Sequence, residues 1–293
     1  MKNIPFYIIT SDATSFILKA TCYLYNKYWN VDNSQYFKIL GNSKPIEKLP
    51  DNFEFIKIKN ENKIKHWTKH IYKFILENEK NDYFILTLDD YLPNRHLKIN
   101  IFDGLISYAE ESEKVGRIGL GWSPVRGYKN IKKFDEYTIY RLNQDTIYRL
   151  VCQTSVWNRE YLLKYFNHNW TPWNLEIRGS KCAKNDDIEI IGAKNDLPFD
   201  WIEESALSSR WPGMINILGL QKEDLKYFIE EGIFKKENLQ YGMWTEYKPP
   251  LFSEVGYDFK FDMVRNHLEA DAFNSSYNHY KNLYESKFEK GIF

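Results

Sequence analysis

The chain has 293 residues, and its 40 lysines and arginines balance its 40 aspartates and glutamates, so its formal net charge is zero. This length suits one large α/β domain or two small ones. A neutral chain lacks the basic excess that is typical of nucleic-acid-binding proteins. Three widely spaced cysteines, Cys22, Cys152 and Cys182, argue against a disulfide framework or a zinc site.

Targeting signals are not evident in the sequence. The first residues lack the long apolar region of a signal peptide. No stretch approaches the ~18 consecutive apolar residues that a transmembrane helix needs. We therefore expect a cytoplasmic protein with no transmembrane segment, and peripheral contact with a membrane surface stays open.

Strands and helices alternate over about the first 120 residues. Short apolar runs predict strands at 6–10, 36–40, 53–58, 83–88 and 115–120. Apolar residues at helical spacing predict helices at 15–29, 67–75 and 101–109. This alternation favours a mostly parallel central sheet flanked by helices on its faces, which is a Rossmann-like α/β fold.

The pattern changes after Gly121. Tyr137–Leu142 and Thr146–Gln153 are two strand-like runs, and we expect them to form a small antiparallel hairpin. Further helices are expected at 155–166, with Ser155 as N-cap, at 170–179, at 223–231 and at 271–286. We predict one domain over residues 1–250 and a helical carboxy-terminal extension over 251–293 packed on it.

Asp89 and Asp90 directly follow the most convincing buried strand, Tyr83–Leu88. In open α/β sheets, ligands bind outside the carboxyl ends of the strands. Two adjacent, partly buried carboxylates repel each other and require a compensating cation. Mg²⁺ or Mn²⁺ would meet that need, because such ions are held by one or two carboxylates together with substrate phosphates and water. The alternative is that the pair only begins a solvated turn.

A second candidate is Glu176 in the segment Trp170-Thr-Pro-Trp173-Asn-Leu-Glu176. Proline at a first helical position starts a short helix. A carboxylate beside aromatic surface suits a general base, and indole faces suit stacking on a sugar ring. The alternative is a surface helix with buried tryptophans and a solvated glutamate.

Three other polar segments have both a functional and a structural interpretation. Thr10-Ser11-Asp12 ends the first strand and suits either nucleotide binding or a helix-entry loop. The segment from Gln153 to Arg159 is a strand-to-helix connection, in which Gln153 suits hydrogen bonding to an acceptor and Ser155 suits an N-cap. Asp186-Asp187 is a second acid pair, which we expect in an exposed loop.

Taken in order, three of these segments resemble the motifs of bacterial and viral glycosyltransferases of the GT-A fold, of the kind found with surface-polysaccharide genes. They are Tyr83-Phe-Ile-Leu-Thr-Leu-Asp-Asp-Tyr-Leu-Pro93, Gln153-Thr-Ser-Val-Trp-Asn-Arg159 and Thr171-Pro-Trp-Asn-Leu-Glu-Ile-Arg-Gly-Ser180. The acidic motif is Asp-Asp-Tyr, where many members have Asp-x-Asp, which leaves open whether one or both aspartates bind metal.

The resemblance implies an inverting transferase that moves a sugar from a nucleotide-sugar donor to a hydroxyl of a glycan or lipid-linked glycan, in polysaccharide biosynthesis. Residues 1–120 would be the nucleotide-binding half and 121–250 the acceptor half. Asp89 and Asp90 would hold Mn²⁺ or Mg²⁺, and Glu176 would be the base. The implied nucleotide site is Thr10, Ser11, Asp12, Trp67 and Asp89, and the implied sugar site is Trp122, Gln153 and Trp173.

Two alternatives belong to other functional classes. A nucleotidyltransferase would use the same metal–diphosphate chemistry, but we would expect a glycine-rich phosphate loop, and residues 6–18 contain no glycine. A non-catalytic carbohydrate-binding or interaction protein would account for the aromatic content of 17%. It would leave Asp89, Asp90 and Glu176 without a role.

Overall fold

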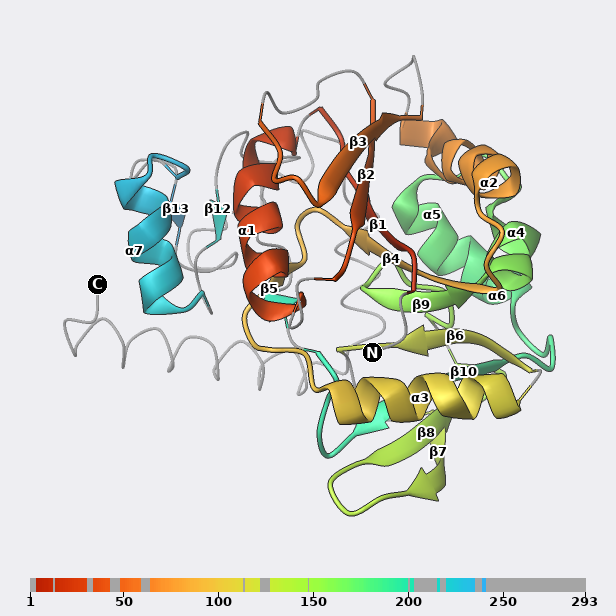
Figure 1. Ribbon diagram of the computed structural model, residues 1–293. Helices are drawn as coiled ribbons and strands as arrows, with labels where there is room; N and C mark the ends of the chain where they lie inside the picture. Colours follow the sequence, from red (N-terminus) through yellow and green to blue (C-terminus); the bar gives the residue numbers. More distant parts are fainter. Residues whose placement is uncertain are drawn as a thin grey trace, which may run out of the picture. The chain divides into compact units, whose positions relative to one another are not determined.

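Figure 1 shows the computed structural model of the chain. The structure describes residues 4–12, 14–30, 34–42, 48–58, 64–112, 114–121, 127–146, 148–199, 201–202, 215–216, 220–234 and 239–240. The chain divides into two compact units, Met1–Ser205 and Ala206–Phe293. The expected extension at 251–293 and the helix expected at 271–286 lie outside the described residues, so the predicted domain boundary stays a prediction.

A nine-stranded sheet forms the centre of the first unit, in the order β3-β2-β1-β4-β9-β6-β10-β8-β7. The strands are β1 (Phe6–Ile9), β2 (Phe37–Gly41), β3 (Phe53–Lys57), β4 (Tyr83–Leu88), β6 (Val115–Gly119), β7 (Tyr128–Lys133), β8 (Thr138–Leu142), β9 (Ser155–Asn158) and β10 (Glu189–Lys194). A separate antiparallel pair joins β5 (Leu92–Pro93) to β11 (Trp201–Ile202). The chain is therefore a mixed α/β protein.

The sheet is mostly parallel in strand direction. Parallel pairings join β3, β2, β1 and β4, and also β6 and β10. Only β9 and β8 run the opposite way, because each pairs antiparallel with both of its neighbours. The carboxyl ends of β1, β4 and β6 consequently share one edge of the sheet with the amino end of β9.

Helices cover both faces of this sheet (Figure 1). Their bounds are η1 (Ser15–Ile17), α1 (Leu18–Tyr28), η2 (Ile64–His66), α2 (Trp67–Asn78), α3 (Ile99–Glu111), α4 (Arg159–Phe166), α5 (Pro172–Asn174), the π-helical turn η3 (Leu175–Gly179) and α6 (Ser180–Cys182). Apolar residues of α1 and α3 pack on one face of the sheet, and those of α2 and α4 pack on the other. The predicted flanking helices are thus confirmed.

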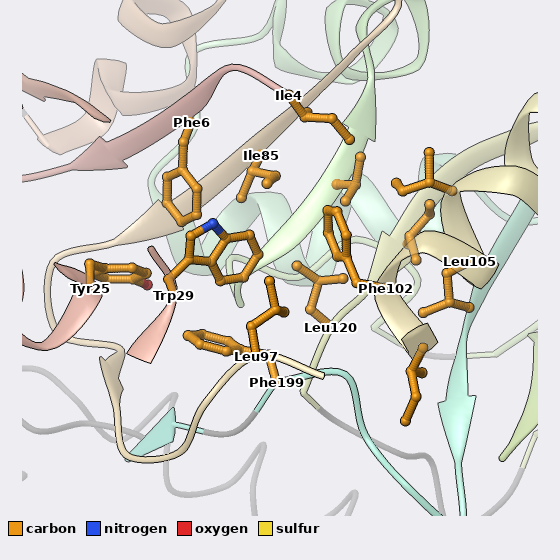
Figure 2. Packing of buried hydrophobic residues seen from close by; sticks show 14 of the residues in the cluster. Ile4, Phe6, Tyr25, Trp29, Ile85, Leu97, Phe102, Leu105, Leu120 and Phe199 are labelled. Carbon is orange, nitrogen blue, oxygen red and sulfur yellow. The ribbon is translucent and has the colours of Figure 1, made fainter. Parts of the chain in front are cut away.

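Trp29 lies at the centre of the core on the α1 and α3 face (Figure 2). Its ring makes edge contacts with Phe6, Phe102 and Phe199, at centroid distances of 4.9, 5.5 and 4.8 Å. Aromatic rings in this arrangement gain energy beyond their buried area. Phe6 comes from β1, Phe102 from α3 and Phe199 from the segment after β10. This cluster therefore joins the first strand of the unit to residues near the end of its sequence.

Two predictions for the middle of the chain were wrong. The second strand of the expected hairpin, Thr146–Gln153, is irregular, and β8 pairs instead with β7. Residues 155–158, expected as the start of a helix, form the buried strand β9. Asn158 rather than Ser155 caps the following helix, since its side chain accepts a hydrogen bond from the backbone nitrogen of Tyr161 at 3.1 Å. Strand β10 was not predicted.

The second unit is described over α7 (Lys222–Glu230) and the parallel pair of β12 (Ile215–Asn216) and β13 (Leu239–Gln240). Helix α7 confirms the helix expected at 223–231. Gly232 follows it with a φ of 64°, the left-handed conformation with which glycine commonly ends a helix. The rings of Phe228 and Phe234 then meet at 4.8 Å, so the chain folds back onto the helix after this turn.

Gly116 and Gly119 of β6 should respond oppositely to alanine. A Cβ at Gly116 would lie 2.5 Å from Ile188 Cγ2 and 2.6 Å from the ring of Tyr161, whereas one at Gly119 has its nearest neighbour at 3.8 Å. We expect Gly116→Ala to lower the free energy of unfolding by about 1–3 kcal/mol through overpacking. Gly119→Ala should leave it unchanged or raise it slightly. Urea unfolding measures both, and equal effects would contradict the packing of Tyr161 on β6.

Candidate active site

The acidic motif at the end of β4 is held by β1 and α1. Thr10 Oγ1 donates a 2.5 Å hydrogen bond to Asp89 Oδ2, and the backbone nitrogen of Asp89 donates to the carbonyl of Ile9 at 3.0 Å. From α1, Thr21 Oγ1 donates to the carbonyl oxygen of Asp89 at 2.9 Å. The structure therefore places Thr10 beside the acidic pair, and its role in a nucleotide site stays a prediction.

Asp89 and Asp90 differ in their surroundings. Asp89 is 3% exposed, and Asp90 is half-buried. Burial raises the pKa of Asp89 to about 6, while hydrogen bonds from the hydroxyls of Thr10 and Thr14 and from backbone amides act in the opposite direction. Asp89 therefore anchors the motif inside the fold, and Asp90 is the more accessible carboxylate of the pair.

The irregular segment Arg149–Thr154, which precedes β9, is anchored at close intervals by buried side chains. The backbone nitrogen of Leu150 donates to Ser180 Oγ at 2.9 Å, and the hydroxyls of Thr154 and Thr87 lie 2.7 Å apart. Because Thr87 belongs to β4, this contact ties the segment to the strand that carries the acidic pair. The expected hairpin strand is thus a fixed loop that enters the site before β9.

Glu176 contacts the same loop. Thr171 caps the short helix α5 by accepting from the backbone nitrogen of Asn174 at 3.1 Å, and Pro172 occupies the first turn, as predicted. The chain continues into the π-helical turn η3, a geometry that is frequent at functional sites. Glu176 Oε1 in this turn accepts a 3.0 Å hydrogen bond from the backbone nitrogen of Cys152, which fixes the orientation of the carboxylate.

The thiol of Cys152 is buried beside Glu176. Burial raises the pKa of this thiol well above its usual value, and the negative charges of Glu176 and Asp90 raise it further. The same two carboxylates therefore act on one buried group, although they lie 86 positions apart in the sequence. The positive charge of Arg117 opposes them and lowers the pKa of the thiol.

Arg117 is a buried residue of the site that sequence reasoning missed. Its Nε and Nη2 donate to Ser155 Oγ at 3.0 and 2.8 Å, and Nη1 donates to the carbonyl of Arg149 at 3.4 Å. Its guanidinium group lies 5.5 Å from the ring centroid of Trp157. Burial lowers its pKa, and the charge of Glu176 is among the influences that raise it. In the sequence, Arg117 lies between Gly116 and Gly119 of a predicted strand, and this pattern did not indicate a buried residue of the site.

The other predicted site residues lie in several different loops and helices. Ser11 Oγ lies 2.9 Å from Thr14 Oγ1, and the carbonyl of Asp12 accepts from Ser15 Oγ at 3.1 Å, so both take part in the helix-entry loop. Trp67 begins α2, with its ring 5.9 Å from that of Phe166. Gln153 is half-buried beside Cys152, and Trp173 lies in α5, three residues before Glu176. Trp122 lies outside the described residues.

A metal held by protein groups alone is not supported in this region. Among the described residues, no group of three histidine, cysteine, aspartate or glutamate side chains is arranged to hold a metal ion. The donor chemistry still fits a hard divalent cation, since Asp90 offers carboxylate oxygens and substrate phosphates and water commonly supply the remaining ligands. The described helices also include none long and apolar enough to cross a membrane.

Comparison with known proteins identifies no family for the chain. No family model matches the chain, and no curated protein matches it. Among solved structures, S. aureus TarS matches with a TM-score of 0.43 and 10% sequence identity, over 68% of this chain and 36% of TarS. The chain thus spans about a third of the length of TarS.

Proposed function

We propose that this chain is a glycosyltransferase that moves a sugar from a nucleotide-sugar donor to a hydroxyl group of a glycan or lipid-linked acceptor. The observation that carries this proposal is that the loop before β9 contacts both acidic segments: Thr154 lies 2.7 Å from Thr87 of β4, three residues before Asp90, and Cys152 donates to Glu176. Asp90 follows the carboxyl end of β4, and open α/β sheets bind ligands at that edge. Two carboxylates from separate segments suit one role in donor binding and another in proton transfer.

In the proposed reaction, the acceptor oxygen attacks the anomeric carbon of the donor. The bond from that carbon to the diphosphate breaks, and its electron pair leaves with the nucleoside diphosphate. Glu176 takes the proton of the acceptor hydroxyl. Its hydrogen bond from Cys152 holds the carboxylate in place for this transfer. A direct displacement of this kind inverts the configuration at the anomeric carbon.

We assign donor binding to Asp90 and to the candidate nucleotide-binding residues. Asp90 is the residue that we expect to hold Mn²⁺ or Mg²⁺, because Asp89 is buried and bonded to Thr10. A bound divalent cation would supply positive charge to the departing diphosphate. Thr10, Ser11, Asp12 and Trp67 remain our candidates for the nucleotide, and Gln153 and Trp173 for the sugars.

The first test is thermal unfolding with UDP-, GDP-, dTDP- and CMP-sugars, each with and without Mn²⁺. A ligand at 100 times its dissociation constant stabilises the folded state by about 2.7 kcal/mol, which raises the melting temperature by a few degrees. We expect one nucleotide class to give this shift only with Mn²⁺. Asp90→Asn should lose the shift, because the amide removes the charge that holds the cation.

Asp135→Asn is the matched control, since Asp135 is exposed and remote in sequence from both acidic motifs. It should keep the full donor-dependent shift. If no donor shifts the melting temperature of cooperatively unfolding protein, the non-catalytic carbohydrate-binding alternative becomes the better explanation. If the shift survives in Asp90→Asn, the cation is held elsewhere.

A further inference from the structure

One guanidinium group holds both ends of the loop Arg149–Thr154. Arg117 lies on β6, and its Nη1 donates to the carbonyl of Arg149, the first residue of the loop, at 3.4 Å. Its Nε and Nη2 donate to the hydroxyl of Ser155, the first residue after the loop, at 3.0 and 2.8 Å. The loop therefore starts and finishes on the same side chain.

The contact at Ser155 continues back into the loop. Ser155 Oγ donates to the carbonyl of Gln153 at 2.8 Å, and Gln153 is the neighbour of Cys152. Cys152 contacts Glu176 through its backbone nitrogen. Because a peptide N–H lies in the rigid plane of its peptide bond, its direction is set by the backbone and no side-chain rotation can restore it. The hydrogen bond to Glu176 therefore requires this loop to keep its conformation.

The guanidinium group of Arg117 is suited to this task by its shape. Arg117 is 4% exposed, and it lies opposite Trp157 in the pairing of β6 with β9, with its guanidinium 5.5 Å from the indole centroid. Burying a charge carries a desolvation penalty, and a well-packed apolar side chain is often at least as good for stability. The planar fork of an arginine, however, directs several donors at once toward separate acceptors. Arg117 thus contributes geometry that an apolar residue would not.

We infer that Arg117 is a positioning residue, whose guanidinium group fixes the loop so that the N–H of Cys152 holds the carboxylate of Glu176 in the orientation for proton transfer. The step to proton transfer rests on the proposed function. The hold on the loop does not, and it is tested without any substrate.

The first test follows the amide of Cys152 by NMR. The chain has three cysteines, so protein labelled with ¹⁵N-cysteine gives one backbone amide signal for each, and Cys152→Ala assigns its signal by loss. An N–H that donates to a carboxylate makes a strong, charge-assisted bond, and its proton is deshielded. We expect Arg117→Met to move this proton upfield, as Glu176→Gln does, while the signals of Cys22 and Cys182 stay in place.

Ser155→Ala removes the acceptor of Arg117 Nε and Nη2 with only a small change in volume. It should move the Cys152 signal in the same direction, and it carries the test if Arg117→Met does not fold. A Cys152 signal that is unmoved in a folded Arg117→Met or Ser155→Ala protein would overturn the inference.

The second test measures transfer, with octyl glycosides as acceptor probes and the donor found by thermal unfolding. A misplacement of about 1 Å at a reacting group can reduce a rate by about 10²-fold. Arg117→Met should therefore lower kcat by about 10- to 100-fold, with the acceptor KM and the donor-dependent melting shift unchanged. Arg117→Lys should recover part of the rate, because it keeps the charge without the planar fork. A raised acceptor KM with normal kcat would contradict a positioning role, since it indicates lost acceptor binding.

Arg141→Met is the matched control, because Arg141 is a partly exposed arginine of β8 that pairs with Glu189. It should change neither the Cys152 signal nor kcat. A Cys152 signal that moves in Arg117→Met while kcat stays normal would overturn the role in proton transfer. If the unmodified chain transfers no sugar at all, the proposed function fails, and the amide signal still decides whether Arg117 holds the loop.

Discussion

Replacing Glu176 by glutamine should abolish sugar transfer while donor binding stays nearly intact. Proton transfer by a positioned side chain contributes about 10²–10⁴ to a reaction rate, and an amide cannot accept the proton. The substitution is structurally mild, because the side-chain oxygen of glutamine can still accept the hydrogen bond that Cys152 donates to Glu176 Oε1. Release of nucleoside diphosphate in the presence of acceptor measures the rate, and the donor-dependent melting shift measures binding.

Glu77→Gln serves as the matched control, since Glu77 is exposed on α2. It should transfer sugar at the normal rate. Normal transfer by Glu176→Gln would mean that the base lies elsewhere or that the mechanism retains configuration. Determining the anomeric configuration of the product by NMR separates these two outcomes, because a retained configuration contradicts direct displacement with Glu176 as base.

Replacing Arg149 by methionine should cause a large loss of stability. Its guanidinium group is fully buried and pairs with Asp186 at 3.0 Å, while Asp186 also accepts from the Tyr165 hydroxyl at 2.7 Å. Removing one partner of a buried ion pair leaves an uncompensated charge and costs about 3–5 kcal/mol. Urea unfolding of Arg149→Met should show this loss in the free energy of unfolding.

Two comparisons test the cause of that loss. Arg141 pairs with Glu189 but its side chain is 39% exposed, so Arg141→Met should cost about 1 kcal/mol or less. Adding Asp186→Asn to Arg149→Met should recover part of the lost stability, because the stranded carboxylate is removed. A similar loss in Arg141→Met and Arg149→Met would show that burial does not govern the cost.

The elements of the first half could be predicted from the sequence because their apolar periodicity is local. Tyr83–Leu88 is apolar on both faces, as a central strand must be, and it was placed correctly. The same reasoning failed at Ser155–Asn158, whose neighbours in the sheet are the strands β4 and β6. Because β9 pairs with strands that are distant in the sequence, its own residues show no strand periodicity. The apolar spacing of the following helix α4 made these residues look helical as well.

The candidate site could also be selected only in part from the sequence. Asp89, Asp90 and Glu176 could be selected because they follow a strand end and a proline-initiated helix. Asp186 was expected in an exposed loop because Lys184 and Asn185 precede it. Its burial depends on Arg149, which lies 37 positions earlier. Arg117 likewise takes its place in the site from contacts with Ser155 and Arg149, which composition and spacing do not reveal.

The position of β9 between β4 and β6 has a consequence for synthesis of the protein on the ribosome. Strand β6 pairs only with β9 and β10 in the described sheet, and both come later in the chain. A nascent chain that ends before Ser155 therefore has β6 without a partner and β4 with one open edge. Unpaired edges of this kind favour association between chains. The sheet is complete only after Lys194 has been added, so these strand edges stay open during synthesis until then.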